Sequence, residues 1–428
     1  MGQLYKTFVT VFFVLTNVAT AYYYLEDEPS LINENLRLAA LGNLSFVLEE
    51  YSNEINIYNF GELSAGIIED DSGKSSLYLR SIYGFDNTLE FSSETDWTGG
   101  TIAIGGIYKY MKQWAIGGSF SGLKRDLGFY SPSEMSHVRY DIKNTRDTAV
   151  VAFHVLKYIS LGLQGAYSRD MIKTTEYINY WESDETTWLV DPSMSITLPG
   201  GKWFFGFGYT YTDMGYYSNV NNTKALTFPI VYRGNNLTVG IKVKHKLSYR
   251  SDGYMSDKET YGGIQGIYRI PIYNKTISIG ALVTRDITCH YREYGDPIHN
   301  WFMDFGGGVA LINNDNGLLG VEIKHRIWQR YAPAYPKQTT LNCGLEFMPL
   351  KFLPVRIGYL YQWWNPENPY TKQMIITMGS GIHLIDKKVN IDFAYNLRIG
   401  SFDWYTTLEP DIHHDIQNIL GISARYTF

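Results

Sequence analysis

The sequence predicts an all-β protein, a closed antiparallel transmembrane β-barrel of about 14 to 18 strands. First, from about residue 75 onward, segments of roughly ten residues alternate apolar and polar side chains, a period that fits strands and not helices. Second, aromatic residues make up 16% of the 428 residues, with 36 tyrosines, and 40 glycines are scattered through the chain. Third, after the N-terminus no apolar run approaches the roughly 20 residues of a membrane helix, which excludes a helical membrane protein.

The N-terminus has the pattern of a secretory signal peptide. A short start with one positive charge, Lys6, precedes the apolar run 8–18, and Ala19-Thr20-Ala21 matches the small-x-small cleavage pattern. A buried first strand is the alternative for this run. We therefore expect export and cleavage after Ala21. The expected organisation is a signal peptide over 1–21, an N-terminal segment of mixed periodicity over 22–74 and the barrel over 75–428.

Three segments show the alternation most clearly. They are Lys202–Thr212, Pro354–Trp363 and Lys388–Arg398. The apolar face of each is expected to point outward: Trp203, Phe205, Phe207, Tyr209 and Tyr211; Val355, Ile357, Tyr359, Tyr361 and Trp363; Val389, Ile391, Phe393, Tyr395 and Leu397. A helix cannot use this pattern, because its apolar stripe repeats near 3.6 residues.

The connections between segments also alternate in length. Short ones lie near 110–112, 157–159, 199–201, 234–236, 271–275, 313–316, 349–352 and 385–387. Long polar ones lie near 84–98, 124–147, 171–191, 213–223, 251–258, 287–300, 330–338, 364–370 and 399–416. Short turns at one rim and longer loops at the other are typical of membrane barrels, and roughly eight short and nine long connections predict about 18 strands.

Closure of the sheet follows from the chemistry of the backbone. In lipid every N–H and C=O group needs a partner, so an open sheet edge is not tolerated. A soluble sandwich or propeller is the alternative, with the apolar face packed inward. The aromatic residues near segment ends favour the barrel, because they suit the girdles at the two membrane interfaces. Examples are Trp301, Tyr361, Trp363, Tyr395 and Tyr426.

The polar face of the segments predicts the lining of the lumen. The candidates are Lys242, Lys244, Asp304, Glu322, Lys324, Arg326, Arg356, Asp392, Arg398 and Arg425. Both signs of charge occur, and charged groups need water or a partner. They form either a polar pathway or binding surface, or a solvated wall whose charges pair with one another or with the N-terminal segment. Glycines on the same face, such as Gly280, Gly306 and Gly308, mark bends or places where another backbone comes close.

No constellation of residues indicates catalysis, a metal or a cofactor. The densest group of possible ligands, Asp411-Ile-His-His-Asp415, lies in a long loop and is interpreted as solvated. No nucleophile elbow and no phosphate-binding loop occurs. The net charge of −6 comes without a basic cluster, so nucleic acid is not an expected partner. The two cysteines, Cys289 and Cys343, are expected to be separate thiols, with a disulfide as the alternative.

The last segment, Gln417–Phe428, places Leu420, Ile422, Ala424, Tyr426 and Phe428 on one face. This ending resembles the final strand of bacterial outer-membrane β-barrels. The resemblance implies an outer-membrane location, contact with outer-membrane lipid, and Tyr426 and Phe428 as a signal for the barrel-assembly machinery. The strand that begins near Ser75 is then expected to close the barrel against it.

The N-terminal segment carries a second resemblance. Leu36–Leu44 ends in a Gly-Asn step and is followed by Leu63-Ser64-Ala65-Gly66-Ile67. These stretches resemble the start of FadL/PorV-type outer-membrane barrels, although the Asn-Pro pair of their motif is replaced. The resemblance implies that residues 22–74 form a plug- or hatch-like segment inside the barrel, and it implies passive passage of small hydrophobic or amphipathic molecules. A structural or interaction barrel that acts through long loops, as a surface binder or a secretion accessory, is the alternative function.

Overall fold

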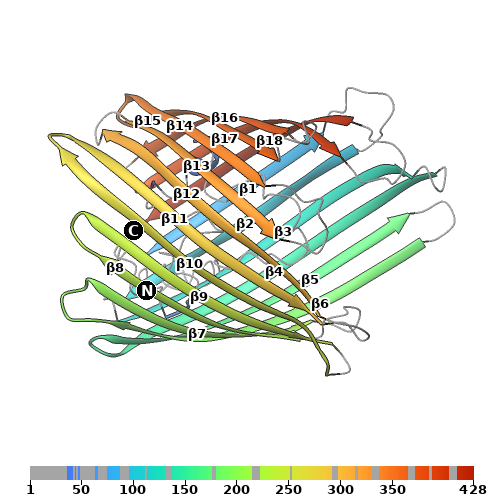
Figure 1. Ribbon diagram of the computed structural model, residues 1–428, viewed down its shortest axis with the longest axis horizontal. Helices are drawn as coiled ribbons and strands as arrows, with labels where there is room; N and C mark the ends of the chain where they lie inside the picture. The colour runs from blue at the N-terminus through green and yellow to red at the C-terminus, as the bar shows by residue number, and fades with distance from the viewer. Residues whose placement is uncertain are drawn as a thin grey trace, which may run out of the picture.

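The structure of the protein is a computed structural model. It describes residues 36–41, 44, 47–48, 63–65, 75–86, 96–110, 113–131, 136–175, 180–214, 222–250, 253–291, 297–313, 317–329, 337–364, 372–384, 388–403 and 412–428. These residues form a single antiparallel sheet of 18 strands that closes on itself (Figure 1). The predicted closed antiparallel barrel is confirmed, at the upper end of the predicted range of strand numbers.

The strands follow one another around the barrel in chain order. They are β1 (Ser76–Asp86), β2 (Asp96–Tyr110), β3 (Trp114–Ser131), β4 (Ser136–Leu156), β5 (Ile159–Thr175), β6 (Tyr180–Thr197), β7 (Trp203–Met214), β8 (Asn222–Arg233), β9 (Leu237–Tyr249), β10 (Met255–Ile272), β11 (Lys275–His290), β12 (Ile298–Asn313), β13 (Gly317–Gln329), β14 (Gln338–Leu350), β15 (Leu353–Trp364), β16 (Lys372–Leu384), β17 (Val389–Asp403) and β18 (Ile412–Thr427).

The barrel closes between β1 and β18, as the sequence predicts. Their register runs from Ser76 opposite Thr427 to Asp86 opposite Gln417. At the C-terminus, the amide of Phe428 donates to the carbonyl of Ser75 over 2.9 Å, and the amide of Ser75 donates back over 3.2 Å. No sheet edge is left open, which is the condition for a β-structure in lipid.

The two faces of the strands differ in burial as the alternation predicts. On β15, Val355 and Ile357 are 39% and 53% exposed, whereas the intervening Arg356 is 1% exposed. The three segments that show the alternation most clearly all place their apolar residues outward. A barrel with exposed apolar side chains outside and buried polar side chains inside is inverted relative to a soluble β-barrel.

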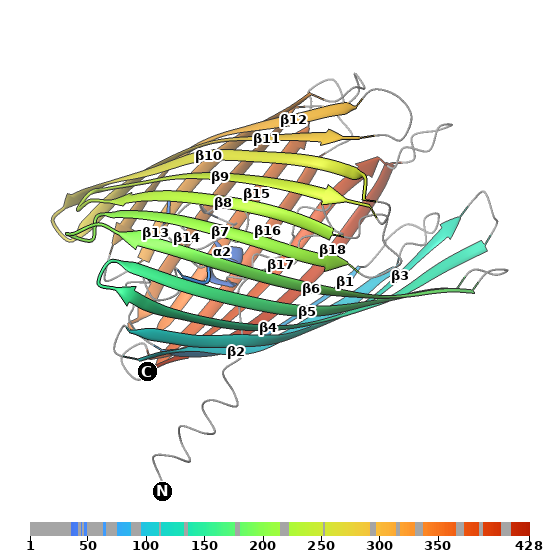
Figure 2. The same cartoon turned by 90° about the horizontal axis from the view of Figure 1, so that it is seen from below.

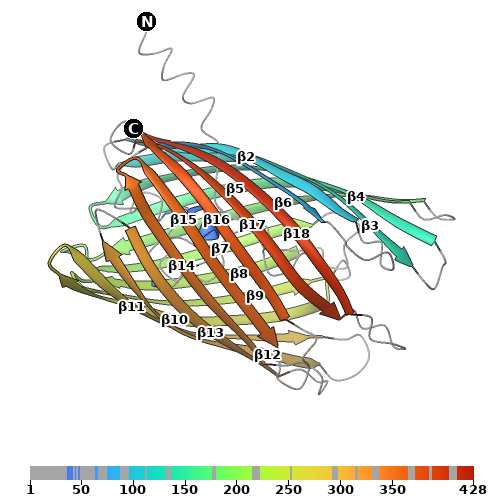
Figure 3. The ribbon, with the colours of Figure 1, turned by 90° about the horizontal axis from the view of Figure 1, so that it is seen from above.

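Three of the predicted long loops are wrong in their extent. In the range 399–416, β17 and β18 stay paired up to Asp403 opposite Ile412, so His413, His414 and Asp415 lie in a strand and not in a loop. The ranges 124–147 and 171–191 are mostly strand, because β3 and β4 stay paired up to Ser131 opposite Ser136, and β5 and β6 up to Thr175 opposite Tyr180. Figure 3 shows these hairpins projecting beyond the neighbouring strands. Where water reaches both faces of a hairpin, polar residues can occupy both, so the apolar–polar alternation fades while the backbone ladder continues.

A single short helix, α2 (Leu36–Ala40), occurs in the described part of the chain, and it lies inside the barrel (Figure 2). None of the described helical residues forms a segment long and apolar enough for a membrane-crossing helix. The expected signal peptide, 1–21, lies outside the described residues, as do Gly66 and Ile67 of the predicted motif.

Candidate functional site

All ten predicted lumen residues lie on the inner face of the barrel. They come from β9 (Lys242, Lys244), β12 (Asp304), β13 (Glu322, Lys324, Arg326), β15 (Arg356), β17 (Asp392, Arg398) and β18 (Arg425). They do not form one cluster. The structure separates them into groups that contact the N-terminal segment, groups that pair within the wall and a basic row on β9.

The first group is an ion-pair network around Glu346, which bridges the wall and the N-terminal segment. Its carboxylate accepts from both Nε and Nη2 of Arg37, over 2.9 and 2.8 Å. It also accepts from Nε of Arg356 over 2.6 Å, and Nη1 of Arg356 donates to Asp392 over 2.6 Å. Arg356 and Glu346 are 1% and 3% exposed. Paired, charge-assisted hydrogen bonds of this kind keep buried charges compensated.

Backbone groups of the N-terminal segment are held by side chains of the wall. The amide of Val47 donates to Glu322 over 2.7 Å, and its carbonyl accepts from the hydroxyl of Ser278 over 2.6 Å. The carbonyl of Ala40 accepts from Thr377 over 3.0 Å. Glu322 is therefore a structural contact of the segment, which satisfies backbone groups that would otherwise be buried without partners.

A second stretch of the segment contacts the other side of the lumen. The hydroxyl of Ser64 lies 2.7 Å from that of Ser193 on β6 and donates to the carbonyl of Asp191 over 3.2 Å. The amide of Ala65 donates to Ser193 over 2.8 Å. Residues 63–65 thus lie against β5 to β7, whereas α2 contacts β15 to β18. The described parts of the segment reach two separate parts of the inner wall.

Inward-facing glycines allow this close approach. A Cβ atom at Gly162 would collide with the backbone of Ala65, and one at Gly344 would collide with the carbonyl oxygen of Leu41. At Gly308, a Cβ atom would lie 2.7 Å from the carbonyl oxygen of Val321 on the neighbouring strand and 2.8 Å from a side-chain carbon of Val47, so the segment approaches this glycine with a side chain and not with its backbone. The wall is therefore shaped to fit the segment.

Apolar side chains of the segment complete the packing. Leu38, Leu41, Leu44 and Val47 form a buried cluster with wall residues that include Leu282, Ala310 and Leu318. A second cluster joins Ala39 and Ala40 to Ile82, Ala394 and Ile419. The lumen of this barrel thus contains a small hydrophobic core, in addition to its polar contacts.

Other lumen charges have partners within the wall itself. Asp304 accepts two hydrogen bonds from Arg326, over 2.7 and 2.9 Å, and Lys324 lies 3.6 Å away. On β9, Lys242, Lys244 and Lys246 follow one another on the inner face, and Lys246 pairs with Glu259 over 3.3 Å.

The last two of the ten predicted lumen residues are arginines. Arg398 lies against the side-chain amide of Gln373, whose oxygen, in the amide orientation that satisfies both groups, accepts from its guanidinium. Arg425 is exposed near the rim where β18 ends.

Several residues that join the N-terminal segment to the wall were not predicted from the sequence. Arg37, Ser193, Ser278, Glu346 and Thr377 all hold the segment in place. Glu346 had a usable signal, because it lies on the polar face of its strand, directly opposite Arg356 across the β14–β15 pair. The serines and the threonine had none, since a short polar residue on an inner face is ordinary in such a barrel.

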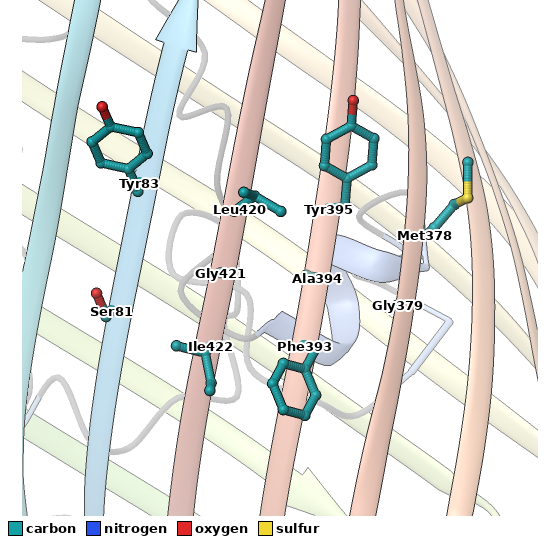
Figure 4. Close-up of a pocket in the computed structure, with 10 residues that line it drawn as sticks. All are labelled: Ser81, Tyr83, Met378, Gly379, Phe393, Ala394, Tyr395, Leu420, Gly421 and Ile422. Carbon is teal, nitrogen blue, oxygen red and sulfur yellow. The ribbon is translucent and has the colours of Figure 1, made fainter.

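Other candidate sites lie elsewhere. A depression of about 460 Å³ lies on the outer surface, over β1 and β16 to β18 (Figure 4). Its most exposed side chains include Tyr83, Met378 and Leu420, so it is not part of the lumen. Within the described ranges, no three His, Cys, Asp or Glu residues are grouped as a metal site would require. Cys289 and Cys343 are free thiols.

No protein-family model and no curated protein matches the chain. Among solved structures, a BenF-like porin from Pseudomonas fluorescens Pf-5 matches with a TM-score of 0.44 and 9% identity, over 83% of this chain and 98% of that one. The monoaromatic hydrocarbon channel CymD matches with a TM-score of 0.37 and 10% identity, over 85% of this chain and 93% of that one. The P. putida toluene transporter TodX matches with a TM-score of 0.38 and 11% identity, over 91% of this chain and 97% of that one. At these values no function is transferred to this chain.

Proposed function

We propose that this chain is an outer-membrane β-barrel for passive transport of small hydrophobic or amphipathic molecules, with residues 22–74 as a plug. The observation that carries the proposal is the position of the N-terminal segment. Its described residues lie within the lumen and are held at Glu346 and Glu322 on one part of the wall and at Ser193 on another. A lumen whose wall is shaped around a segment of the same chain suits a transport pathway that a plug obstructs.

The membrane location is supported by the outer surface. Exposed, large apolar side chains occur on strands all around the barrel, for example Leu79, Trp188, Ile241 and Ile357. Such a surface would aggregate in water and is stable in hydrocarbon. The resemblance of the chain's ends to outer-membrane barrels and to the FadL/PorV type supports the outer membrane and this class of cargo.

The proposal is tested by conductance in planar bilayers and by solute uptake into liposomes. We expect the mature chain to conduct little and a chain that lacks residues 22–74 to show large, stepwise conductance, because the segment obstructs the lumen. Uptake of a hydrophobic solute by the intact chain would identify the cargo class. If both forms are shown to be folded and neither form conducts or takes up solute, the transport proposal is refuted.

A second function, an interaction barrel, is favoured by the projecting hairpins. β3 to β6 extend as paired strands beyond the neighbouring strands (Figure 3), so they offer a surface outside the membrane. If this surface is the functional part, replacing residues 126–139 by a short turn should abolish attachment to a partner and leave conductance unchanged. The two functions are thus separated by which variant loses which activity.

A further inference from the structure

The outer faces of β9 to β12 carry only basic charges. The structure describes every residue of these four strands. Their outward positions include His245, Lys258, Lys275, Arg285 and His299 and no carboxylate. The acidic residues of the same strands, Asp257, Glu259, Asp286 and Asp304, are all on the inner face. This part of the outer surface therefore complements an anion.

Arg285 is the most unusual of these basic residues, because it is exposed within an apolar surface. On its own strand the outward neighbours are Val283 and Ile287, and across the strand pairs it faces Gly262 and Met303. Its guanidinium lies 5.6 Å from the centre of the Trp301 ring. A cation that faces hydrocarbon is costly unless it has a polar partner. The ring covers one face of the guanidinium and leaves N–H groups at its edge for a ligand.

The space beside Arg285 is open. A Cβ atom at Gly262 would have no atom within 4 Å, so the glycine forms a notch between β9 and β11. At one end of the notch, Nδ1 of His245 lies 2.9 Å from the hydroxyl of Thr260. At the other end lies Ile264, which is 46% exposed. The notch is polar toward the loops and apolar toward the middle of the barrel.

The position of the notch along the strand fits a membrane interface. On β11, Lys275 and Arg285 enclose an outward run of Ile277, Ile279, Ala281 and Val283. A transmembrane strand needs about 9 to 11 residues. Lys275 and Arg285 therefore lie at the two margins of the apolar band, with Arg285 at the margin nearer the loops.

We propose that the notch at Gly262 binds the phosphate-bearing headgroup of an anionic lipid of the loop-side leaflet. The phosphate accepts hydrogen bonds from Arg285 and from the His245–Thr260 pair, and an acyl chain lies along Ile264 and Val283. A guanidinium suits a phosphate because its planar N–H groups can bind two oxygens at once. The inference rests on the proposed membrane location of the barrel, and it does not depend on transport.

Native mass spectrometry of the full mature chain in detergent can test this. The probes are phosphatidylglycerol and phosphatidylcholine with identical acyl chains. We expect phosphatidylglycerol to bind the wild type more tightly, and Arg285→Gln to weaken its binding about tenfold, which corresponds to about 1.4 kcal/mol. Arg285→Lys should retain only part of the binding, since it keeps the charge but loses the paired N–H groups of the guanidinium. Lys275→Gln is the matched control, since it removes a cation at the opposite margin of the same strand.

A second variant guards against misfolding of the first. Gly262→Val keeps every charge and fills the notch, so it should weaken binding as Arg285→Gln does. Equal binding of the two lipids, equal losses in Arg285→Gln and Lys275→Gln, or unchanged binding in Gly262→Val would each overturn the proposal. The same would follow if inorganic phosphate alone displaced the lipid at equal concentration. Because binding is measured without a gradient or a pore, its failure is separate from a failure of transport.

Discussion

Glu346 is the residue that joins the N-terminal segment to the wall, because one buried carboxylate accepts from Arg37 and from Arg356. Glu346→Gln should therefore destabilise the folded barrel by about 3 kcal/mol, since it leaves the buried Arg356 poorly compensated. It should also raise conductance, because Arg37 loses its ion pair with the wall. The measurements are the urea midpoint of unfolding in detergent and single-channel current.

Arg169→Gln is the control for this variant. It breaks an ion pair of similar geometry, between Arg169 on β5 and Asp184 on β6, that lies on the outer face of the wall. It should leave conductance unchanged. If both variants raised conductance equally, the Arg37–Glu346 pair would have no specific role in holding the segment.

A side chain added at Gly162 tests how closely the N-terminal segment packs against the wall. In a background with Cys289 and Cys343 replaced by alanine, cysteines at Ser64 and Ser193 should form a disulfide, because the two hydroxyls lie 2.7 Å apart. Gly162→Val should abolish this cross-link, since its side chain would collide with Ala65. Gly165→Val is the control on the same strand, where a Cβ meets only an oxygen of Leu189 at 3.9 Å.

Cross-linking is read on a non-reducing gel after mild oxidation. A cross-link that persisted in Gly162→Val would show that the backbone of residues 63–65 can move away from the glycine and still reach Ser193. Loss of the cross-link in both glycine variants would point instead to a general disturbance of β5.

At the scale of single elements, the ladders of β7 are interrupted on both sides. Pro192 on β6 and Pro229 on β8 flank it and cannot donate to its ladders, and the pairing of β7 is interrupted beside both. The side chain of Leu63 fills the inner space beside Gly206 and Gly208 at this level. We infer that the segment supports β7 where hydrogen bonding is lost.

Leu63→Ala should accordingly speed amide hydrogen exchange in β7 and leave β9 unchanged, because local openings follow the local loss of contacts. Leu44→Ala is the control, since Leu44 lies beside Gly320 and Gly344 and should affect β13 and β14 instead. Exchange would be followed by mass spectrometry of peptides from each strand. Uniform acceleration across all strands would contradict a local role for Leu63.

The C-terminal strand gives a second prediction at this scale. Tyr426 and Phe428 are exposed on the outer face, with ring centres 5.5 Å apart, whereas Arg425 faces inward. Deletion of Phe428 should reduce insertion of the barrel into the membrane severalfold, and Arg425→Ala should not. The fraction of heat-modifiable protein in the membrane measures this. Normal insertion without Phe428 would remove its role as an assembly signal.

Different elements were predictable to different degrees. β15 and β17 could be assigned, with their inner and outer faces, because apolar residues face outward and polar ones inward along their full length. The ends of β3 to β6 could not, because both faces there tolerate polar residues. The position of the N-terminal segment could not be predicted either, because it depends on contacts with residues more than a hundred positions away. Examples are Arg37 with Glu346 and Ser64 with Ser193.

At the scale of the whole molecule, closure of the barrel and filling of its lumen are separate sources of stability. The ladder between β1 and β18 is complete without any residue before Ser75. The segment adds Leu38, Leu41, Leu44 and Val47, all at most 1% exposed. Burial of each such side chain contributes about 1.5 to 3 kcal/mol as an upper estimate.

A chain without residues 22–74 should therefore still fold into a closed, heat-modifiable barrel, but it should lose its native gel mobility at a lower temperature than the mature chain. The comparison requires only gel mobility after heating at increasing temperatures. The control is Leu44→Ala in the full chain, which should lie between the two because it removes one buried side chain and keeps the polar contacts of the segment. If the shortened chain never reached the folded mobility, the segment would be part of the folding core of the barrel, and its removal could not be used to open the lumen.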